Sequence, residues 1–148
     1  MLSKKPELLA PAGDLTKLKT AIDYGADAVY IGGKAFSLRT ASDNFSREEM
    51  EEGIRYAHAK GKKCYAALNI IAHNDDLKEL ESYLKELQDC GIDAVIVADM
   101  GIFDIVRKKA SSLPVHISTQ ASNTNYASVS FFKELGAKRI VLARELSF

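Results

Sequence analysis

The stretch Gly91-Ile-Asp-Ala-Val-Ile-Val-Ala-Asp99 consists of a glycine, a short apolar run and a polar end. The same pattern recurs in Gly25–Gly33, Gly61–Asn69 and Gly136–Arg144. A glycine suits the left-handed position that follows a helix. Each apolar run is short enough to be a strand that is buried on both faces. Together the four copies predict a parallel sheet built from βα units.

The segments between these strands show the apolar spacing that is typical of amphipathic helices. The predicted apolar stripes are Leu15, Leu18 and Ile22; Met50, Ile54 and Ala57; Leu77, Leu80, Leu84 and Leu87; Ile102, Ile105 and Val106; and Ala127, Phe131 and Leu135. Asp14 is expected to cap the first helix, and Ser46 with Glu49 forms a capping box for the second. With first and fifth strands at 7–10 and 114–118, the sequence predicts six strands alternating with five helices.

The stretch from Val115 to Asn125 helps to choose between two architectures, an open doubly wound sheet and a (β/α)8 barrel. His116 and Ser118 share one face of the fifth strand, where a covered parallel sheet is usually apolar. A barrel lumen accepts polar residues near its mouth. The dinucleotide-binding pattern Gly-x-Gly-x-x-Gly is also missing after the first strand. We therefore predict an α/β fold, a TIM-barrel-like (β/α) partial barrel of about six parallel strands with flanking helices.

The chain has 148 residues, whereas full barrels of this type need about 250. Arg144-Glu-Leu-Ser147 resembles the approach to a sixth helix, with Ser147 as its cap. We therefore expect residues 1–148 to form a single N-terminal fragment of a barrel domain, which lacks about two βα units.

The charge balance is neutral, with 20 Lys and Arg against 20 Asp and Glu. It provides no electrostatic argument for a nucleic acid or membrane partner. Cys64 and Cys90 are far apart and form no metal-spaced pair, which favours buried thiols in a reducing compartment. We expect a cytoplasmic protein without a membrane segment or a metal site in this chain.

Polar residues at the carboxyl ends of successive strands are expected to gather at one rim of the barrel. The candidate substrate-binding residues are Asp14, Tyr30, Arg39, Asn69, Asp99, Thr119, Gln120, Asn123 and Arg144. For Asp14 and Asp99 the alternative role is that of a helix cap. Arg39 lies in a long loop, where it either closes over an anionic ligand or anchors the loop.

Hydrolytic machinery has little support in the sequence, which contains neither Gly-x-Ser-x-Gly nor His-Glu-x-x-His. The weak catalytic candidates are His116, Ser118 and Glu145. By strand rise, the side chains of His116 and Ser118 are about 6–7 Å apart. That separation is too long for a direct hydrogen bond between a nucleophile and its base.

Five stretches carry a resemblance to a known family. They are Glu7-Leu-Leu-Ala-Pro-Ala-Gly-Asp14; Ala28-Val-Tyr-Ile-Gly-Gly33; Phe36-Ser-Leu-Arg39 with Asn44-Phe45; Val115–Asn125; and Arg139-Ile-Val-Leu-Ala-Arg-Glu-Leu-Ser147. In this order they resemble peptidase family U32, the collagenase-like proteases. The resemblance implies the N-terminal part of a TIM-barrel-like domain.

The resemblance implies two activities for an intact protein. The leading hypothesis is a peptidase that acts on peptide bonds. The alternative is a substrate-binding part of an iron–sulfur-dependent protein that hydroxylates tRNA, rRNA or a quinone. The cluster cysteines of such relatives are expected further along the chain, and neither Cys64 nor Cys90 matches them, so no cofactor is assigned to this chain.

A third hypothesis is an inactive structural fragment. Its first and sixth strands would leave open sheet edges, through which the chain is expected to self-associate.

Overall fold

The computed structural model describes residues 5–33, 36 and 44–147. Its strands are β1 (Leu9–Pro11), β2 (Ala28–Ile31), β3 (Lys63–Leu68), β4 (Ala94–Val97), β5 (Val115–Ile117) and β6 (Arg139–Ile140). Its helices are α1 (Leu15–Asp23), α2 (Arg47–Ala59), α3 (Leu77–Cys90), α4 (Met100–Lys109) and α5 (Tyr126–Glu134), with a short 3₁₀ helix, η2 (Thr119–Ala121). Six strands therefore alternate with five α-helices, as the sequence predicts.

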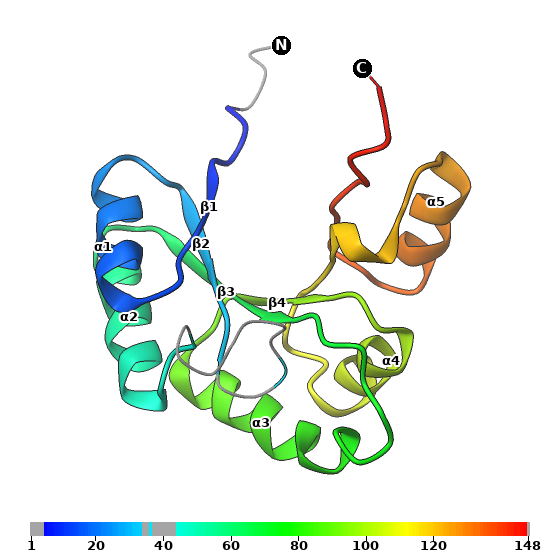
Figure 1. Ribbon diagram of the computed structural model, residues 1–148, viewed down its shortest axis with the longest axis horizontal. Helices are drawn as coiled ribbons and strands as arrows, with labels where there is room; N and C mark the ends of the chain where they lie inside the picture. Colours follow the sequence, from blue (N-terminus) through cyan, green and yellow to red (C-terminus); the bar gives the residue numbers. More distant parts are fainter. Residues whose placement is uncertain (1–4, 34–35, 37–43, 148) are drawn as a thin grey trace.

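The strands form one parallel sheet in the order β1-β2-β3-β4-β5-β6. A doubly wound sheet reverses its strand order at a switch point, whereas a barrel adds strands in sequence. Figure 1 shows the sheet as an open arc with the helices on its convex side and the two chain ends near the opening. The fold is thus a half-barrel, and the predicted fold class is confirmed.

The local signals that position these elements behave as the sequence predicts. Gly25, Gly61, Gly91 and Gly136 all have positive φ, between 67° and 105°. The side chain of Asp14 accepts a hydrogen bond from the backbone N–H of Lys17, and Ser46 and Glu49 form the capping box of α2. The glycines therefore follow helix ends at defined residues, and the caps fix the residues at which α1 and α2 begin.

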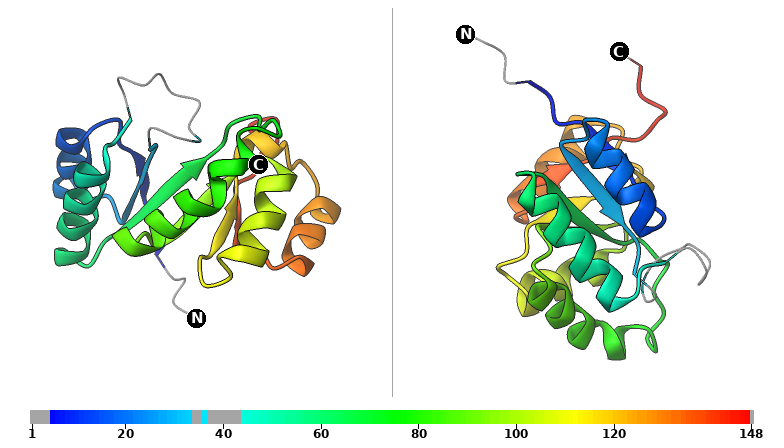
Figure 2. Two further views of the ribbon diagram at one scale, coloured as in Figure 1. Left: turned by 90° about the horizontal axis from the view of Figure 1, so that it is seen from below. Right: turned by 90° about the vertical axis from the view of Figure 1, so that its left-hand side faces the viewer.

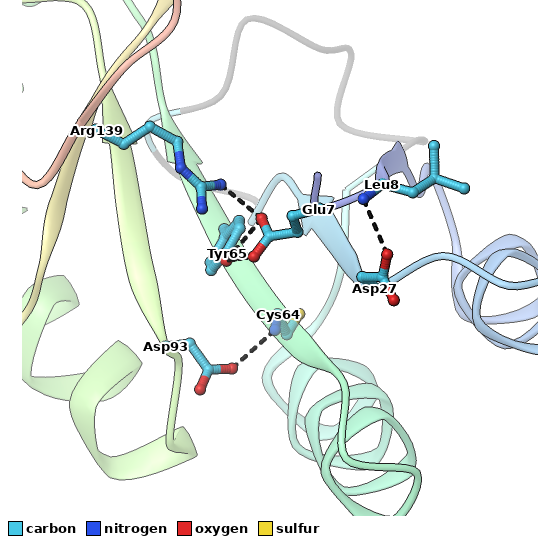
Figure 3. Close-up of polar contacts among 7 residues, drawn as sticks. All are labelled: Glu7, Leu8, Asp27, Cys64, Tyr65, Asp93 and Arg139. Carbon is cyan, nitrogen blue, oxygen red and sulfur yellow. Dashed lines mark hydrogen bonds and ion pairs between the residues drawn. The ribbon is translucent and has the colours of Figure 1, made fainter. Parts of the chain in front are cut away.

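The aspartate of the repeated pattern links neighbouring strands at their amino ends. Oδ2 of Asp27 accepts a hydrogen bond from the backbone N–H of Leu8 at 3.0 Å, and Oδ2 of Asp93 accepts one from Cys64 at 2.8 Å (Figure 3). The Leu8 N–H and Lys62 lower the pKa of Asp27 to about 2. The aspartate of the repeat thus hydrogen-bonds the start of β2 to the segment before β1, and the start of β4 to β3.

The two faces of the sheet carry different cores. The outward face packs against the helices through buried residues such as Val29, Cys64 and Val95. The inward face is a small cluster of Ala28, Tyr65, Ala94 and Ile96 with the partly buried Leu9 and Tyr30. His116 and Ser118 are buried as well, at 6% and 5% exposure. Because side chains alternate along a strand, every second residue of each strand lines the lumen.

Three sequence predictions need correction. The first strand spans Leu9–Pro11 rather than 7–10, so Glu7 lies before it. The fifth strand spans Val115–Ile117 rather than 114–118, so Ser118 follows it. In α5 the buried aromatic residue is Phe132, which stacks edge-on against Phe103 at 6.0 Å, while Phe131 is 52% exposed. Ala127 is exposed too. Two adjacent phenylalanines satisfy either helical register, so spacing alone selected the wrong one.

Figure 2 shows from two further sides that the helices stay on one face of the sheet. Among the described residues, no helix combines the length and apolar character needed to cross a membrane.

Candidate functional site

A cleft of about 260 Å³ opens where the strands end at the mouth of the half-barrel. We call it the lumen cleft; it is lined by Leu9, Tyr30, Ala67, Asn69, Ile96, Ser118, Thr119, Gln120, Val141 and Arg144. Leu9, Tyr30, Ala67 and Ile96 line it from inward positions within the strands, and its other residues come from the segments that follow the strands. The lumen cleft therefore has apolar walls and a polar rim, as small-molecule sites usually have.

A second cleft of about 340 Å³ lies beside the first. This side cleft is lined by Asn69, Ile70, Ile71, Ala98, Asp99 and Gln120. Asn69 and Gln120 line both clefts. A carboxamide offers two donors and an acceptor with two lone pairs. Two carboxamides at the shared boundary can thus hydrogen-bond a ligand in either cleft.

The end of β5 holds Gln120 at this boundary. The hydroxyl of Ser118 accepts a hydrogen bond from the backbone N–H of Gln120 at 3.2 Å. The hydroxyl of Thr119 donates to the carbonyl of Leu142 at 3.1 Å, which ties η2 to the segment after β6. Gln120 itself is exposed. Both hydroxyls therefore fix the backbone of this segment. The Gln120 residue is thereby placed where it lines both clefts.

A polar network lies deeper in the lumen. Nη1 of Arg139 donates to Oε1 of Glu7 at 2.6 Å, and the hydroxyl of Tyr65 contacts both Glu7 oxygens at 3.0 Å (Figure 3). Tyr65 precedes Ala67 by one inward position on β3, so this network lies about 6–7 Å below the cleft wall. Glu7 and Arg139 neutralise each other and form a polar floor that is partly exposed.

The floor residues shift each other's pKa. The hydrogen bond from Arg139 lowers the pKa of Glu7, and that from Glu7 raises the pKa of Arg139. Burial, together with the Glu7 carboxylate, raises the pKa of Tyr65 to about 12. At neutral pH the floor is therefore one carboxylate, one guanidinium and a protonated phenol.

His116 is buried next to this floor. Its ring contacts the Tyr65 ring edge-on, with 4.8 Å between the ring centroids. Its Nδ1 atom is buried without a hydrogen-bond partner in the described chain. Burial, and then the nearby Arg139 charge, lowers the pKa of His116 to about 4. The imidazole is therefore neutral at pH 7.

The three catalytic candidates do not form a hydrolytic site. His116 faces Tyr65, and its unpartnered Nδ1 makes no bond to Ser118. The Ser118 hydroxyl is engaged with the Gln120 backbone. Glu145 is exposed and lines neither cleft. Without a base within hydrogen-bond reach, Ser118 has no activated nucleophile character.

The structure divides the remaining predicted site residues. Asn69, Gln120 and Arg144 meet at the lumen cleft with Tyr30 and Thr119. Asp99 caps α4 through the N–H of Ile102 at 2.8 Å and also lines the side cleft. Two described residues, Asp14 and Asn123, line neither cleft.

Asp14 only caps α1 and pairs with Lys17, whose hydrogen bond lowers the pKa of Asp14. Asn123 is buried, and its backbone carbonyl accepts a hydrogen bond from the backbone N–H of Ala143 at 3.0 Å. Arg39 lies outside the described residues. Phe36, from the same loop, is buried and stacks on Tyr83 at 5.3 Å, which is an anchoring role.

Sequence reasoning missed the apolar walls and the floor. The wall residues Leu9, Ala67, Ile96 and Val141 occupy inward positions. Alternation along β3 places Asn69, Ala67 and Tyr65 on the same side, so the sequence could have predicted this wall and part of the floor. No comparable pattern connects Glu7 with Arg139.

The described residues do not fit an iron–sulfur cluster or another metal centre. No group of three or more His, Cys, Asp or Glu is arranged to hold a metal within the described ranges. Burial raises the pKa of Cys64 and of Cys90, so both thiols are protonated at neutral pH without a metal. The absence of a cofactor from this chain stays a prediction.

Known proteins resemble this chain over almost all of its length. It is 51% identical over 147 residues to the tRNA hydroxylation protein P1 of Bacillus subtilis, which covers 99% of this chain and 35% of that protein. It is 45% identical over 143 residues to the tRNA hydroxylation protein P of Escherichia coli, which covers 97% of this chain and 32% of that protein. The chain thus spans about a third of the length of these relatives.

The comparison with solved structures concerns the fold. The structure of the U32 peptidase Mk0906 matches with a TM-score of 0.72 at 19% identity, over 96% of this chain and 61% of that one. At this identity the likeness supports the half-barrel and carries no information on the reaction.

The leading hypothesis of a peptidase is wrong. Relatives at 51% and 45% identity are tRNA hydroxylation proteins, and the candidate residues His116 and Ser118 form no hydrogen-bonded pair. The alternative of RNA hydroxylation agrees better with both observations.

The resemblance to the family itself is confirmed. The model of the family described as "Peptidase family U32" matches residues 13–148, which include every described residue of the side cleft and all but Leu9 of the lumen cleft. The chain therefore belongs to peptidase family U32.

Proposed function

We propose that this chain forms the substrate-binding face of an RNA-hydroxylating protein, with tRNA as its substrate. The observation that carries the proposal is the 51% identity to a tRNA hydroxylation protein over 99% of the chain. The chain's part is to bind and position RNA at the mouth of the half-barrel.

The chemistry of the rim supports an RNA substrate. Asn69 and Gln120 provide neutral donors and acceptors of the kind that read base edges. Arg144 adds a cation that suits a phosphate or a base carbonyl. Sequence-specific RNA recognition usually targets unpaired bases that are stacked and hydrogen-bonded on their edges.

The charge balance indicates how such binding is achieved. The chain has no excess of cations, so it gains little from neutralising phosphates. Affinity must then come mainly from contacts to bases.

Complementation tests the proposal. A strain of Escherichia coli without its tRNA hydroxylation protein P would receive the complete gene that encodes this chain, and hydroxylated tRNA nucleosides would be measured by mass spectrometry. We expect the gene to restore the hydroxylated nucleoside, and we expect Asn69→Ala with Gln120→Ala to reduce it at least tenfold.

Gln88→Ala is the matched control, because this carboxamide lies on α3, donates a hydrogen bond to Ser112 and lines neither cleft. It should restore modification as well as the unchanged gene does. If the expressed protein restores no hydroxylated nucleoside while the native relative does, the proposal is refuted.

A further inference from the structure

We infer that the lumen cleft holds a single unstacked nucleobase, read on its edge by the side chains of Asn69 and Gln120. This inference rests on the proposed function and goes beyond it by assigning the base to one cavity and two residues.

The size of the lumen cleft fits one base. Its volume of about 260 Å³ lies below the roughly 300 Å³ at which sites for drug-sized ligands begin. A cavity of this size is too small for a folded RNA as a whole and suits a single ring system. Enzymes that act on a base take it out of the stack and into such a pocket.

The walls suit a flat, weakly polar ring. Tyr30, Ile96 and Leu9 contribute ring and aliphatic surface on inward strand positions. Stacking of a base on an aromatic side chain is sequence-tolerant, because every base has a π-face. The walls therefore provide affinity for a base without selecting which base it is.

The floor favours a neutral ligand. The charges of Glu7 and Arg139 are paired at 2.6 Å, and the Tyr65 hydroxyl is engaged with the same carboxylate. An ammonium ion pushed into the lumen would meet no carboxylate among the described residues that line the cleft, and a carboxylate would meet only Arg144 at the rim. Burying an unpaired ion is costly. A nucleobase is uncharged at neutral pH and meets no such penalty.

The rim supplies the hydrogen bonds. Asn69 and Gln120 stand at the boundary of the lumen cleft and the side cleft. Each carboxamide can donate and accept at once, which matches the mixed donor and acceptor edge of a base. Arg144, on the same rim, has donors only, so it is assigned to the phosphate that follows the base.

A bulged RNA hairpin separates base binding from binding to the RNA backbone. One hairpin carries a single unpaired cytidine as a bulge, and the second is identical except that this nucleotide is abasic. Dissociation constants for the 148-residue chain would be measured by fluorescence anisotropy. We expect the abasic hairpin to bind at least about tenfold more weakly, the equivalent of one stacking contact.

Variants identify the reading residues. Asn69→Ala and Gln120→Ala should each weaken binding of the cytidine hairpin about three- to tenfold and leave the abasic hairpin unchanged. Gln88→Ala, the distant carboxamide, should change neither. The hairpin comparison uses the unchanged protein, so its result does not depend on how any variant folds.

The outcomes distinguish this inference from the proposed function. Equal affinity for the two hairpins overturns the base-binding inference and leaves RNA binding intact. Binding to neither hairpin counts against the proposed function itself. Loss of binding to both hairpins in Asn69→Ala or Gln120→Ala, with folding retained, shows that these residues contact the RNA backbone and overturns their assignment as base readers.

Discussion

Arg139 and Glu7 are separated by 132 positions in sequence, yet Nη1 of Arg139 donates to Oε1 of Glu7 at 2.6 Å. Arg139 opens β6, and Glu7 lies just before β1. The ion pair therefore connects the two ends of the strand arc through the lumen. Because the Tyr65 hydroxyl on the central strand β3 hydrogen-bonds to the same carboxylate, β3, β6 and the segment just before β1 share one polar link.

Glu7→Gln should lower the free energy of unfolding by about 1–3 kcal/mol. The substitution removes the charge that partners the partly buried Arg139 and weakens the Tyr65 hydrogen bond. Chemical denaturation of both proteins measures the difference. The exposed pair of Asp104 and Lys108 on α4 is the matched control, and Asp104→Asn should change stability by less than about 0.5 kcal/mol. Equal effects of the two substitutions would show that the lumen pair has no special weight.

Stability should fall as the pH is lowered from about 6.5 to about 4 because of His116. The folded pKa of His116 is lowered to about 4, so between these values only the unfolded chain takes up the proton. One proton bound on unfolding gives a slope of at most about 1.4 kcal/mol per pH unit. The stability is fully present above pH 6.5.

His116→Phe keeps an aromatic ring against Tyr65 and removes the titrating group. The variant should have a smaller slope between pH 6.5 and pH 4, as measured by denaturation at several pH values. Carboxylates whose pKa is lowered, such as Glu7 and Asp27, keep their own contribution near pH 4. His73→Gln, at an exposed position, should keep it. A slope in His116→Phe that matches the unchanged protein would assign the effect to other groups.

Gly33→Ala should destabilise the protein by about 1–3 kcal/mol through a steric clash. A Cβ atom at this position would lie 1.8 Å from the hydroxyl oxygen of Tyr83 and 2.9 Å from its Cζ. Tyr83 is buried and stacks on Phe36, so its ring has little room to move. Thermal or chemical denaturation measures the loss.

Tyr83→Phe tests the cause of that effect. It removes the hydroxyl oxygen of Tyr83, which is the nearest clashing atom. This oxygen has no hydrogen-bond partner in the described part of the chain. The double variant Gly33→Ala/Tyr83→Phe should therefore recover part of the lost stability. Purely additive effects of the two substitutions would mean that Gly33 matters for another reason.

Self-association of the isolated chain stays a prediction, and the surface beside β6 gives it a location. A cleft of about 880 Å³ there is lined in part by Tyr126, Leu142 and Leu146, which are 87%, 49% and 41% exposed. We expect light scattering to show a mass that rises with concentration above 16.2 kDa, and Leu142→Glu to suppress the rise. Ile71→Glu, at an exposed position outside this cleft, is the control. A constant monomer mass would contradict the prediction.

The fold could be predicted from the sequence because its signals are local. Gly91 and its equivalents end helices in the left-handed conformation, and Asp99 caps the helix that follows its strand. Such features depend on a few neighbouring residues, so one sequence is sufficient to find them. The prediction of the buried face of α5 was wrong because Phe131 and Phe132 are chemically equal. Only packing against Phe103 distinguishes them.

The site could be predicted in part. Asn69, Gln120 and Arg144 share the mouth because parallel strands end at one rim, which follows from topology alone. The pairing of Glu7 with Arg139 depends on how far the arc curves, and no local pattern encodes that curvature. The sequence left the role of Asp14 open for a different reason. An aspartate in this position can either cap a helix or bind a ligand.

Side-chain amide signals of Asn69 and Gln120 provide the most direct measurement of the central claim, that the mouth of the half-barrel binds RNA. In two-dimensional nitrogen–proton NMR spectra of the chain titrated with the bulged cytidine hairpin, these two signals should move first and furthest, and that of Gln88 should stay in place. If the hairpin moves the Gln88 signal or the backbone signals of α5 and leaves Asn69 and Gln120 unchanged, RNA binds elsewhere and the account is contradicted.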